Sequence, residues 1–173
     1  MTEKSDVEIA PRWRPSDVLV IDTNIILSAV LGRRSLPAFE AISRKRSIAT
    51  SARVAEEARR VLRGGLSDLP SDALAREEAI LGGINVIAAH AYAVFLDRAA
   101  RVLSDAVASR NGSASDAHVL GCAWLLDADI WSHDRDFAGT GWPSWSNANL
   151  LRPSRAPDSL TNPPAMSPSA LAD

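Results

Sequence analysis

The stretch VLVIDTNIIL at residues 18–27 decides the fold of this chain. It opens with four apolar residues, three of them β-branched, and a continuous apolar run of this kind predicts a strand buried on both faces. Thr23 or Asn24 can then cap a helix that begins at Ile25. Ligands of open α/β sheets bind outside the carboxyl ends of the strands, so Asp22 occupies a candidate functional position. A plain strand-to-helix turn with a surface aspartate is the alternative interpretation.

The same pattern of short apolar runs and longer amphipathic segments continues along the chain. Further strands are expected over 47–50, 84–87 and 130–132, with a fifth at the end of the Gly- and Trp-rich stretch 138–150. Helices are expected up to residue 31 and over about 36–45, 51–63, 70–81, 89–109 and 115–127. Strands that alternate with helices form right-handed βαβ units, so the sequence predicts an α/β fold with a mainly parallel sheet.

Composition divides the 173 residues into one domain with two extensions. Residues 1–16 look like a loose, flexible lead-in, 17–151 carry the alternating pattern, and the Pro-, Ser- and Ala-rich residues 152–173 are expected to be disordered. The single cysteine excludes an intramolecular disulfide and suits a reducing compartment, so a cytoplasmic location is expected. The chain has no 18-residue apolar run, and no membrane span is expected.

Positive charge is concentrated in one part of the chain. Nine of the nineteen Lys and Arg residues lie between Arg33 and Arg63, where only three glutamates oppose them. A cluster of this kind can bind phosphate groups, although solvated helix faces are the common alternative. The residues expected to contact an RNA backbone are Arg33, Arg34, Arg44, Lys45 and Arg46.

Helical periodicity separates two adjacent glutamates in the helix expected at 51–63. The apolar side of this helix includes Val54 and Ala58. Glu57 falls on the border of that side, whereas Glu56 points away from it. Only Glu57 can therefore reach a cleft shared with the core. The alternative is a border glutamate that pairs with an arginine on the surface.

Asp116 lies in the first turn of the helix expected at 115–127, on the same side as Val119 and Ala123. Its spacing from Ser113 is that of a capping box, and a carboxylate near a helix N-terminus is favourable by about 0.3–1 kcal/mol. Capping alone would explain an aspartate at this position. It would not explain why the side chain is directed towards the apolar side.

An acidic pair follows the strand expected at 130–132. Asp134 and Asp136 are two residues apart, so their side chains share a side if the backbone stays extended. A charge-rich turn, in which Asp136 caps a short helix at Phe137, is the alternative. Together with Asp22, these residues mark strand ends that meet at one edge of a parallel sheet.

Carboxylates gathered at one sheet edge repel one another unless a cation neutralises them. Oxygen ligands suit hard ions such as Mg²⁺ or Mn²⁺. The residues expected to bind such an ion are Asp22, Asp116, Asp134 and Asp136. His118 and His133 each neighbour a candidate acid, but a surface position is favoured over a metal-binding role. The sequence has no Cys/His zinc spacing, no Walker A loop and no G-x-G-x-x-G after the first strand, which argues against nucleotide cofactors.

Four short motifs together resemble the PIN-domain nucleases, a family that includes the VapC-type toxins of bacterial toxin–antitoxin pairs. In order, they are IDTN at 21–24, SARVAEEARRVL at 51–62, SDAH at 115–118 and WSHDRDF at 131–137. Each motif is short, but four in order with suitable spacing are specific, and the resemblance covers about 17–151. The run from 66 to 110 is long for a compact toxin, and the Pro-rich tail matches no motif.

The resemblance implies a three-layer α/β/α sandwich around a central parallel sheet. It implies a Mg²⁺- or Mn²⁺-dependent endoribonuclease that cleaves single-stranded RNA by metal-activated water, as the toxin of a VapBC-type system. The implied partners are the RNA substrate, a cognate antitoxin protein and a second copy of the chain. The catalytic acids that the motifs assign are Asp22, Glu57, Asp116 and Asp134.

Two other interpretations stay open. The first is a catalytically idle PIN-like module that binds RNA or protein, which would need one of the four acids to be missing, and none is. The second is another phosphate enzyme on a doubly wound sheet, such as a structure-specific DNA nuclease or a phosphatase. A phosphatase with an aspartate nucleophile would want a second aspartate two residues after Asp22, where Asn24 stands. Fold alone does not decide among these functions.

Overall fold

The computed structural model describes residues 14–32, 35–64, 69–105 and 113–152. Within these ranges the strands form a sheet in the order β3-β2-β1-β4-β5, and every neighbouring pair is parallel. The strands are β1 (Val18–Ile21), β2 (Ser47–Ser51), β3 (Asn85–Ile87), β4 (Asp129–Trp131) and β5 (Ser144–Trp145). The predicted α/β fold with a parallel sheet is confirmed.

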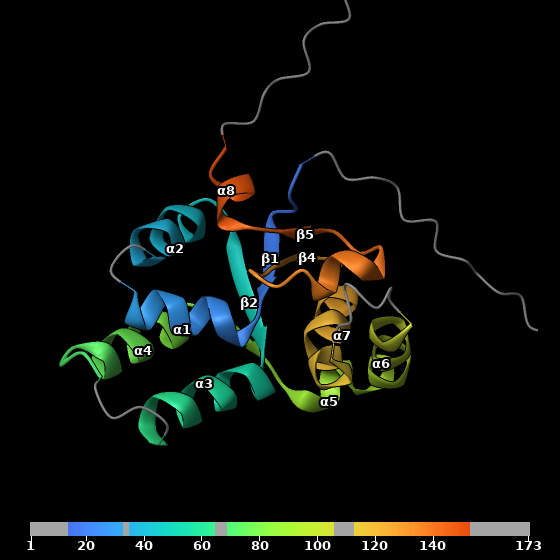
Figure 1. Cartoon of the computed structure of the whole chain (residues 1–173), viewed down its shortest axis with the longest axis horizontal. Coiled ribbons are helices and arrows are strands. Elements are labelled where there is room, and N and C mark those ends of the chain that lie inside the picture. The colour runs from blue at the N-terminus through green and yellow to red at the C-terminus, as the bar shows by residue number, and fades with distance from the viewer. Residues whose placement is uncertain (1–13, 33–34, 65–68, 106–112, 153–173) are drawn as a thin grey trace, which may run out of the picture.

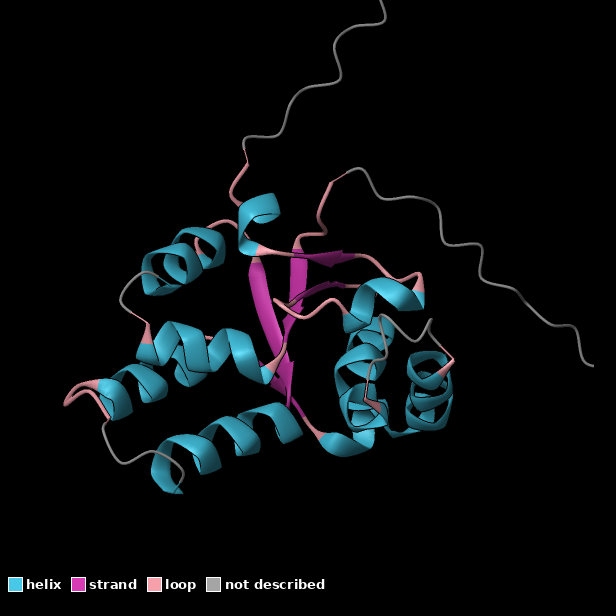
Figure 2. Ribbon diagram, viewed as in Figure 1, coloured by secondary structure: helices cyan, strands magenta, loops and turns pink. Residues whose placement is uncertain are grey.

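Helices cover both faces of the sheet (Figure 1). One layer holds α1 (Thr23–Leu31), α2 (Ser35–Ser43), α3 (Ala52–Gly64) and α4 (Ala73–Gly82). The opposite layer holds α5 (Ala89–Tyr92), α6 (Leu96–Ser104) and α7 (Ala117–Leu126), and a short α8 (Asn147–Leu150) follows β5. Figure 2 shows the strands between these two groups of helices, so the expected three-layer sandwich is confirmed. None of the helices in the described ranges is long and apolar enough to cross a membrane.

The central strand β1 separates the two halves of the sheet. Leu19, Val20 and Ile21 have no exposed surface, with β2 on one side of them and β4 on the other. The chain leaves β1 for β2 and later returns to the opposite side of β1 as β4, which makes this a topological switch point. Because Ile21 pairs with Trp131, the residues that follow the two strands lie side by side at the carboxyl edge of the sheet.

The sequence predicts one long helix over 89–109, and this prediction is wrong for the residues that the structure describes. The chain there forms α5, the 3₁₀ turn η1 (Ala93–Phe95) and α6. Tyr92 is buried at the break, where its backbone packs against Gly121 of α7 at ordinary van der Waals distance. The break lets Tyr92 enter the core while α6 packs along α7. The periodic pattern of apolar residues does not reveal this break, because α5 and α6 both keep helical spacing. Residues 106–109 of the predicted helix lie outside the described residues.

The end of the lead-in is fixed to the sheet. The Ser16 N–H donates to the Asp129 carboxylate at 2.9 Å, and the Ser16 hydroxyl oxygen accepts the Asp129 N–H at 2.9 Å. Arg46 donates to the carbonyl oxygens of Pro15 and Ser16 at 3.3 and 3.1 Å. These two residues, expected to be loose, are therefore held by β4 and by the turn before β2. The parts of the lead-in and tail that lie outside the described residues are 1–13 and 153–173.

Candidate active site

A cavity of about 160 Å³ lies at the carboxyl ends of β1 and β4. Its walls come from the start of α1, from α3, from the start of α7 and from the segment after β4. The fold thus brings four distant parts of the chain to one place. The carboxylates that line the cavity are Asp22, Glu57, Asp116 and Asp134.

The carboxylate of Asp22 is held from two directions. Its Oδ1 accepts the N–H of Ile25 at 2.9 Å, so Asp22 itself is the N-cap of α1, in place of Thr23 or Asn24. Its Oδ2 accepts the hydroxyl of Ser132. Burial raises the pKa of Asp22, although both hydrogen bonds oppose this effect. The fold therefore fixes this carboxylate at a position where its negative charge is costly.

Ser132 is a site residue that stands inside the WSHDRDF motif, although the sequence analysis predicted no role for it. It directly follows β4 and is 4% exposed. Its hydroxyl donates to Asp22 and accepts the N–H of Asp134 at 2.8 Å, so it links the ends of β1 and β4. The only signal for it is the pairing of these two strands, which places the first residue after each strand side by side. The local sequence does not contain that information.

Glu57 faces the cavity from α3. The Thr23 hydroxyl donates to Oε2 of Glu57 at 2.8 Å, so the residue after Asp22 orients a second acid. Glu57 is half-buried and lines the cavity, whereas Glu56 is exposed. The helical phase read from the sequence agrees with this placement, and the catalytic role of Glu57 stays a prediction.

Asp116 enters the cavity at the end of a 3₁₀ turn, η3 (Ala114–Asp116), that leads into α7. Its side chain makes no capping hydrogen bond, and Ser113 instead caps η3 by accepting the N–H of Ser115 at 3.1 Å. Capping therefore does not account for this aspartate. The pKa of Asp116 is raised to about 6, by burial first and then by the charges of four neighbouring carboxylates.

Asp134 and Asp136 both follow β4 but occupy different places. Asp134 is exposed to the cavity, and its Oδ1 accepts the N–H of Asp136 at 3.2 Å. Asp136 begins the 3₁₀ turn η4 (Asp136–Thr140), whose cap position belongs to Arg135, so the capping role considered for Asp136 is not found. Burial, and then the charge of Asp134, raise the pKa of Asp136. Asp136 does not line the cavity, but its charge contributes to the raised pKa of Asp116.

His118 is buried, which corrects the surface position expected for it, whereas His133 is exposed as expected. The second position of α7 faces β2, and there the His118 Nδ1 lies 2.9 Å from Oγ of Ser51. Ser51 also accepts the N–H of Val54 at 3.1 Å. Burial, followed by the charge of Arg53, lowers the pKa of His118 to about 4. The ring is therefore neutral at pH 7.

The chemistry of the cavity suits a hard divalent cation. Carboxylate oxygens are the ligands that Mg²⁺ and Mn²⁺ prefer, and the raised pKa of Asp116 reflects a repulsion that a cation would relieve. In the part of the chain that the structure describes, no three Asp, Glu, His or Cys side chains already form a metal-binding group. The donor atoms fit the predicted ion, and the ligand set stays a prediction.

The predicted RNA-contact residues do not lie at this cavity. Arg33 and Arg34 lie outside the described residues. The other three, 44–46, precede β2 and lie at the amino edge of the sheet, whereas the cavity is at the carboxyl edge. A strand of five residues separates these edges by about 13 Å. Contact of 44–46 with RNA stays a prediction, and it would occur away from the acids.

The fold and the acidic cavity define the class of α/β domains that carry a carboxylate site at the switch point of a parallel sheet. The model of the PIN domain family matches residues 20–153, a range that includes all four acids of the cavity. The chain therefore belongs to the PIN domain family.

One solved structure with a similar fold is the crystal structure of VapBC2 from Rickettsia felis bound to a DNA fragment from their promoter. The chain aligns with it at a TM-score of 0.59 and 13% identity, over 75% of this chain and 98% of that chain. At this identity the likeness shows the fold alone. Among curated proteins, the comparison gives no match.

The raised pKa of Asp116 predicts a stability change with pH in the absence of metal. Between its ordinary pKa of 3.8 and the folded value of about 6, the folded chain binds more protons than the unfolded chain. Stability should therefore fall as the pH rises through this window. In EDTA, Asp116→Asn should raise the melting temperature at pH 8 by about 2–4 °C, which is roughly 1 kcal/mol after solvent screening of a half-buried group. At pH 4 the two proteins should melt together.

Glu56→Gln is the control for this experiment, because it removes an exposed carboxylate and should shift the melting temperature little at either pH. Added Mn²⁺ should then stabilise the wild type more than Asp116→Asn, since a ligand of the folded state raises its stability. A destabilised Asp116→Asn at pH 8, or equal stabilisation of both proteins by Mn²⁺, would contradict the repulsion inferred for this site.

Proposed function

We propose that this protein is a divalent-metal-dependent endoribonuclease that cleaves single-stranded RNA. The observation that carries the proposal is the convergence of four acids, Asp22, Glu57, Asp116 and Asp134, on one cavity at the switch point. Membership of the PIN domain family supports it, because PIN domains are generally nucleases. An idle PIN-like module is the weaker candidate, since it gives no reason to keep mutually repelling carboxylates in a partly buried cavity.

The metal has a defined place in this proposal. When bound, Mg²⁺ or Mn²⁺ would neutralise the carboxylates and lower the pKa of a water molecule at the cavity. The residues that would hold it are Asp22, Asp116 and Asp134, and Asp136, whose N–H donates to Asp134, would assist as a neighbouring acid.

Glu57 and His118 differ in what they can do during hydrolysis. The Thr23 hydroxyl orients the Glu57 carboxylate, which can position the attacking water and take its proton. The water oxygen then bonds to phosphorus as the bond from phosphorus to the 3′ oxygen breaks. Burial lowers the pKa of His118 to about 4, so its neutral ring is a weak base, and its Nδ1 already contacts the Ser51 hydroxyl, which makes it poorly suited to activate the 2′-hydroxyl. The RNA 2′-hydroxyl therefore takes no part in this chemistry.

Product analysis tests the reaction directly. Attack by water should leave 5′-phosphate and 3′-hydroxyl ends, and EDTA should abolish cleavage of a single-stranded RNA. The measurement is end-group analysis of the fragments by mass spectrometry, with and without EDTA. Cyclic phosphate ends, or cleavage that survives EDTA, would refute the four-acid mechanism. Faster cleavage of branched or structured DNA than of RNA would favour a DNA nuclease instead.

The two neighbouring glutamates of α3 give a matched pair of variants. Glu57→Gln should lower kcat by at least about 10²-fold, because it removes the carboxylate that accepts the proton of the attacking water. Glu56→Gln should leave kcat nearly unchanged, since its side chain is exposed away from the cavity. Both substitutions remove one negative charge and keep the shape of the side chain. Equal activities for the two variants would show that Glu57 is not in the catalytic machinery.

The proposal extends to the biological setting as the toxin of a VapBC-type pair. Its support is the likeness in fold to a VapBC2 structure, together with membership of the PIN domain family. The partners would be the RNA substrate, a cognate antitoxin protein and a second copy of the chain, in the cytoplasm. A small neighbouring gene should encode an antitoxin that copurifies with this chain and blocks its cleavage of RNA. Normal growth of cells that express the active chain alone would contradict a toxin.

A further inference from the structure

The acidic cavity repels the substrate that the proposed function requires. A nucleic acid carries one negative charge per nucleotide, and the cavity adds four carboxylates. A bound cation offsets the charge at the scissile phosphate only. The phosphates on either side of it still need positive side chains within reach of the cavity, and residues 44–46 lie at the opposite edge of the sheet.

The four arginines of α3 divide into two pairs. Arg59 and Arg63 face α4, where their Nε atoms lie 3.7 and 3.6 Å from the Glu77 carboxylate, and Glu77 is only 1% exposed. Although these arginines are 46% and 64% exposed, their charges offset that of the buried Glu77. Arg53 and Arg60 are exposed, and neither forms a salt bridge within the described ranges. Within the described ranges, this second pair has no carboxylate partner that would compete with an external anion.

The free pair brackets Glu57 on the surface of α3. Arg53, Glu57 and Arg60 are spaced i, i+4 and i+7, so they form one stripe about 60° wide and about 10 Å long. Val54 and Val61, which line the cavity, flank this stripe on its buried side. The two arginines therefore lie on α3 next to residues that line the cavity, although they do not line it themselves, and Glu57 stands between them along the helix.

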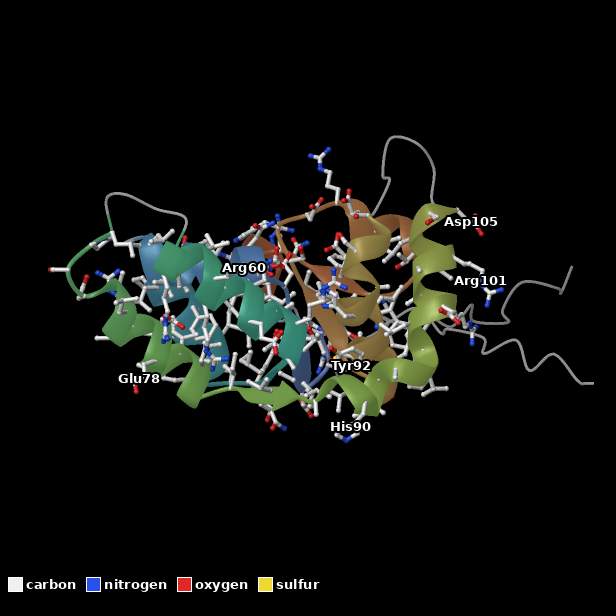
Figure 3. The ribbon with its side chains drawn as sticks, turned by 90° about the horizontal axis from the view of Figure 1, so that it is seen from below. Arg60, Glu78, His90, Tyr92, Arg101 and Asp105 are labelled. Atoms are coloured by element: carbon white, nitrogen blue, oxygen red, sulfur yellow. The ribbon has the colours of Figure 1, made fainter. Side chains whose placement is uncertain are left out.

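Two observations connect these arginines to the cavity itself. Arg53 directly precedes Val54, which lines the cavity, and it lies two residues after Ser51, whose Oγ is 2.9 Å from Nδ1 of His118 in the same cavity wall. Arg60 lies on α3 (Figure 3) and directly precedes Val61, which also lines the cavity. Neither arginine is needed to compensate a buried carboxylate.

We propose that Arg53 and Arg60 are substrate-positioning residues that bind backbone phosphates of single-stranded RNA along the α3 rim of the cavity. This inference rests on the proposed nuclease function and adds the route by which the substrate crosses the site. Arginine suits the role because its guanidinium forms bidentate hydrogen bonds with phosphate oxygens. Because they hold phosphates beside the scissile one, the two residues act on binding more than on the chemical step.

The test measures binding without cleavage. A fluorescently labelled single-stranded RNA is titrated in EDTA over a range of salt concentrations, and the slope of log affinity against log salt is recorded. Arg53→Ala/Arg60→Ala should weaken binding and flatten the slope by about 1.4, the value for two phosphate contacts on a single strand. With Mn²⁺ present, the same variant should raise KM and leave kcat within about twofold of the wild type.

The controls separate position from net charge. Arg101→Ala/Arg152→Ala also removes two exposed arginines, on α6 and after α8, and should keep the wild-type slope. Arg53→Lys/Arg60→Lys keeps the charge and should restore most of the slope. Circular dichroism and the melting temperature confirm that each variant folds. A third double variant, Arg44→Ala/Lys45→Ala, tests the turn before β2 as the competing contact surface.

The outcomes are distinct. An unchanged slope for Arg53→Ala/Arg60→Ala in a protein that still binds and cleaves RNA would overturn this inference and leave the nuclease function intact. An equal loss in the Arg101/Arg152 control, or a loss confined to the Arg44/Lys45 variant, would also overturn it. A wild type that neither binds nor cleaves single-stranded RNA would overturn the inference and the proposed function together.

Discussion

The hydrogen bond from Ser132 to Asp22 joins the ends of β1 and β4, and the rest of the site is arranged around this junction. It is possible because the two strands are parallel neighbours in register, with Ile21 opposite Trp131. The same aspartate caps α1 through the N–H of Ile25, so one carboxylate ties both strand ends to the first helix. A carboxylate fixed in this way loses little freedom when a cation or a substrate binds.

Charge compensation explains much of what surrounds the junction. Asp22 and Asp116 are ionisable groups whose burial raises their pKa values, and their mutual repulsion adds to that cost. On the other side of α3, the buried Glu77 is compensated by two arginines. The cavity has no such internal partners for its carboxylates among the described ion pairs. This contrast is what makes the cavity, and not the Glu77 cluster, the candidate for binding an external cation.

Local sequence determined the parts of the site that depend on period and on strand ends. The apolar run of β1 followed by Asp22 placed a carboxylate at the edge of the sheet, and helical phase distinguished Glu57 from Glu56. Other features depend on contacts between distant segments. The break at Tyr92 accompanies the burial of its side chain in the core, and His118 is buried because α7 faces Ser51. No residue next to either position in the sequence carries that information.

The sequence by itself determined the α/β class, the parallel sheet, the order of the four acidic motifs and the kind of ion they suit, because each follows from periodicity, strand ends and ligand chemistry. Only the tertiary structure decided which basic residues lie at the same edge of the sheet as the acids. Charge along the chain forms one cluster from Arg33 to Arg63, but the described part of it spans both edges of the sheet and both sides of α3. The strand β2 separates the basic residues 44–46 from the arginines of α3, because its five residues run from one edge of the sheet to the other.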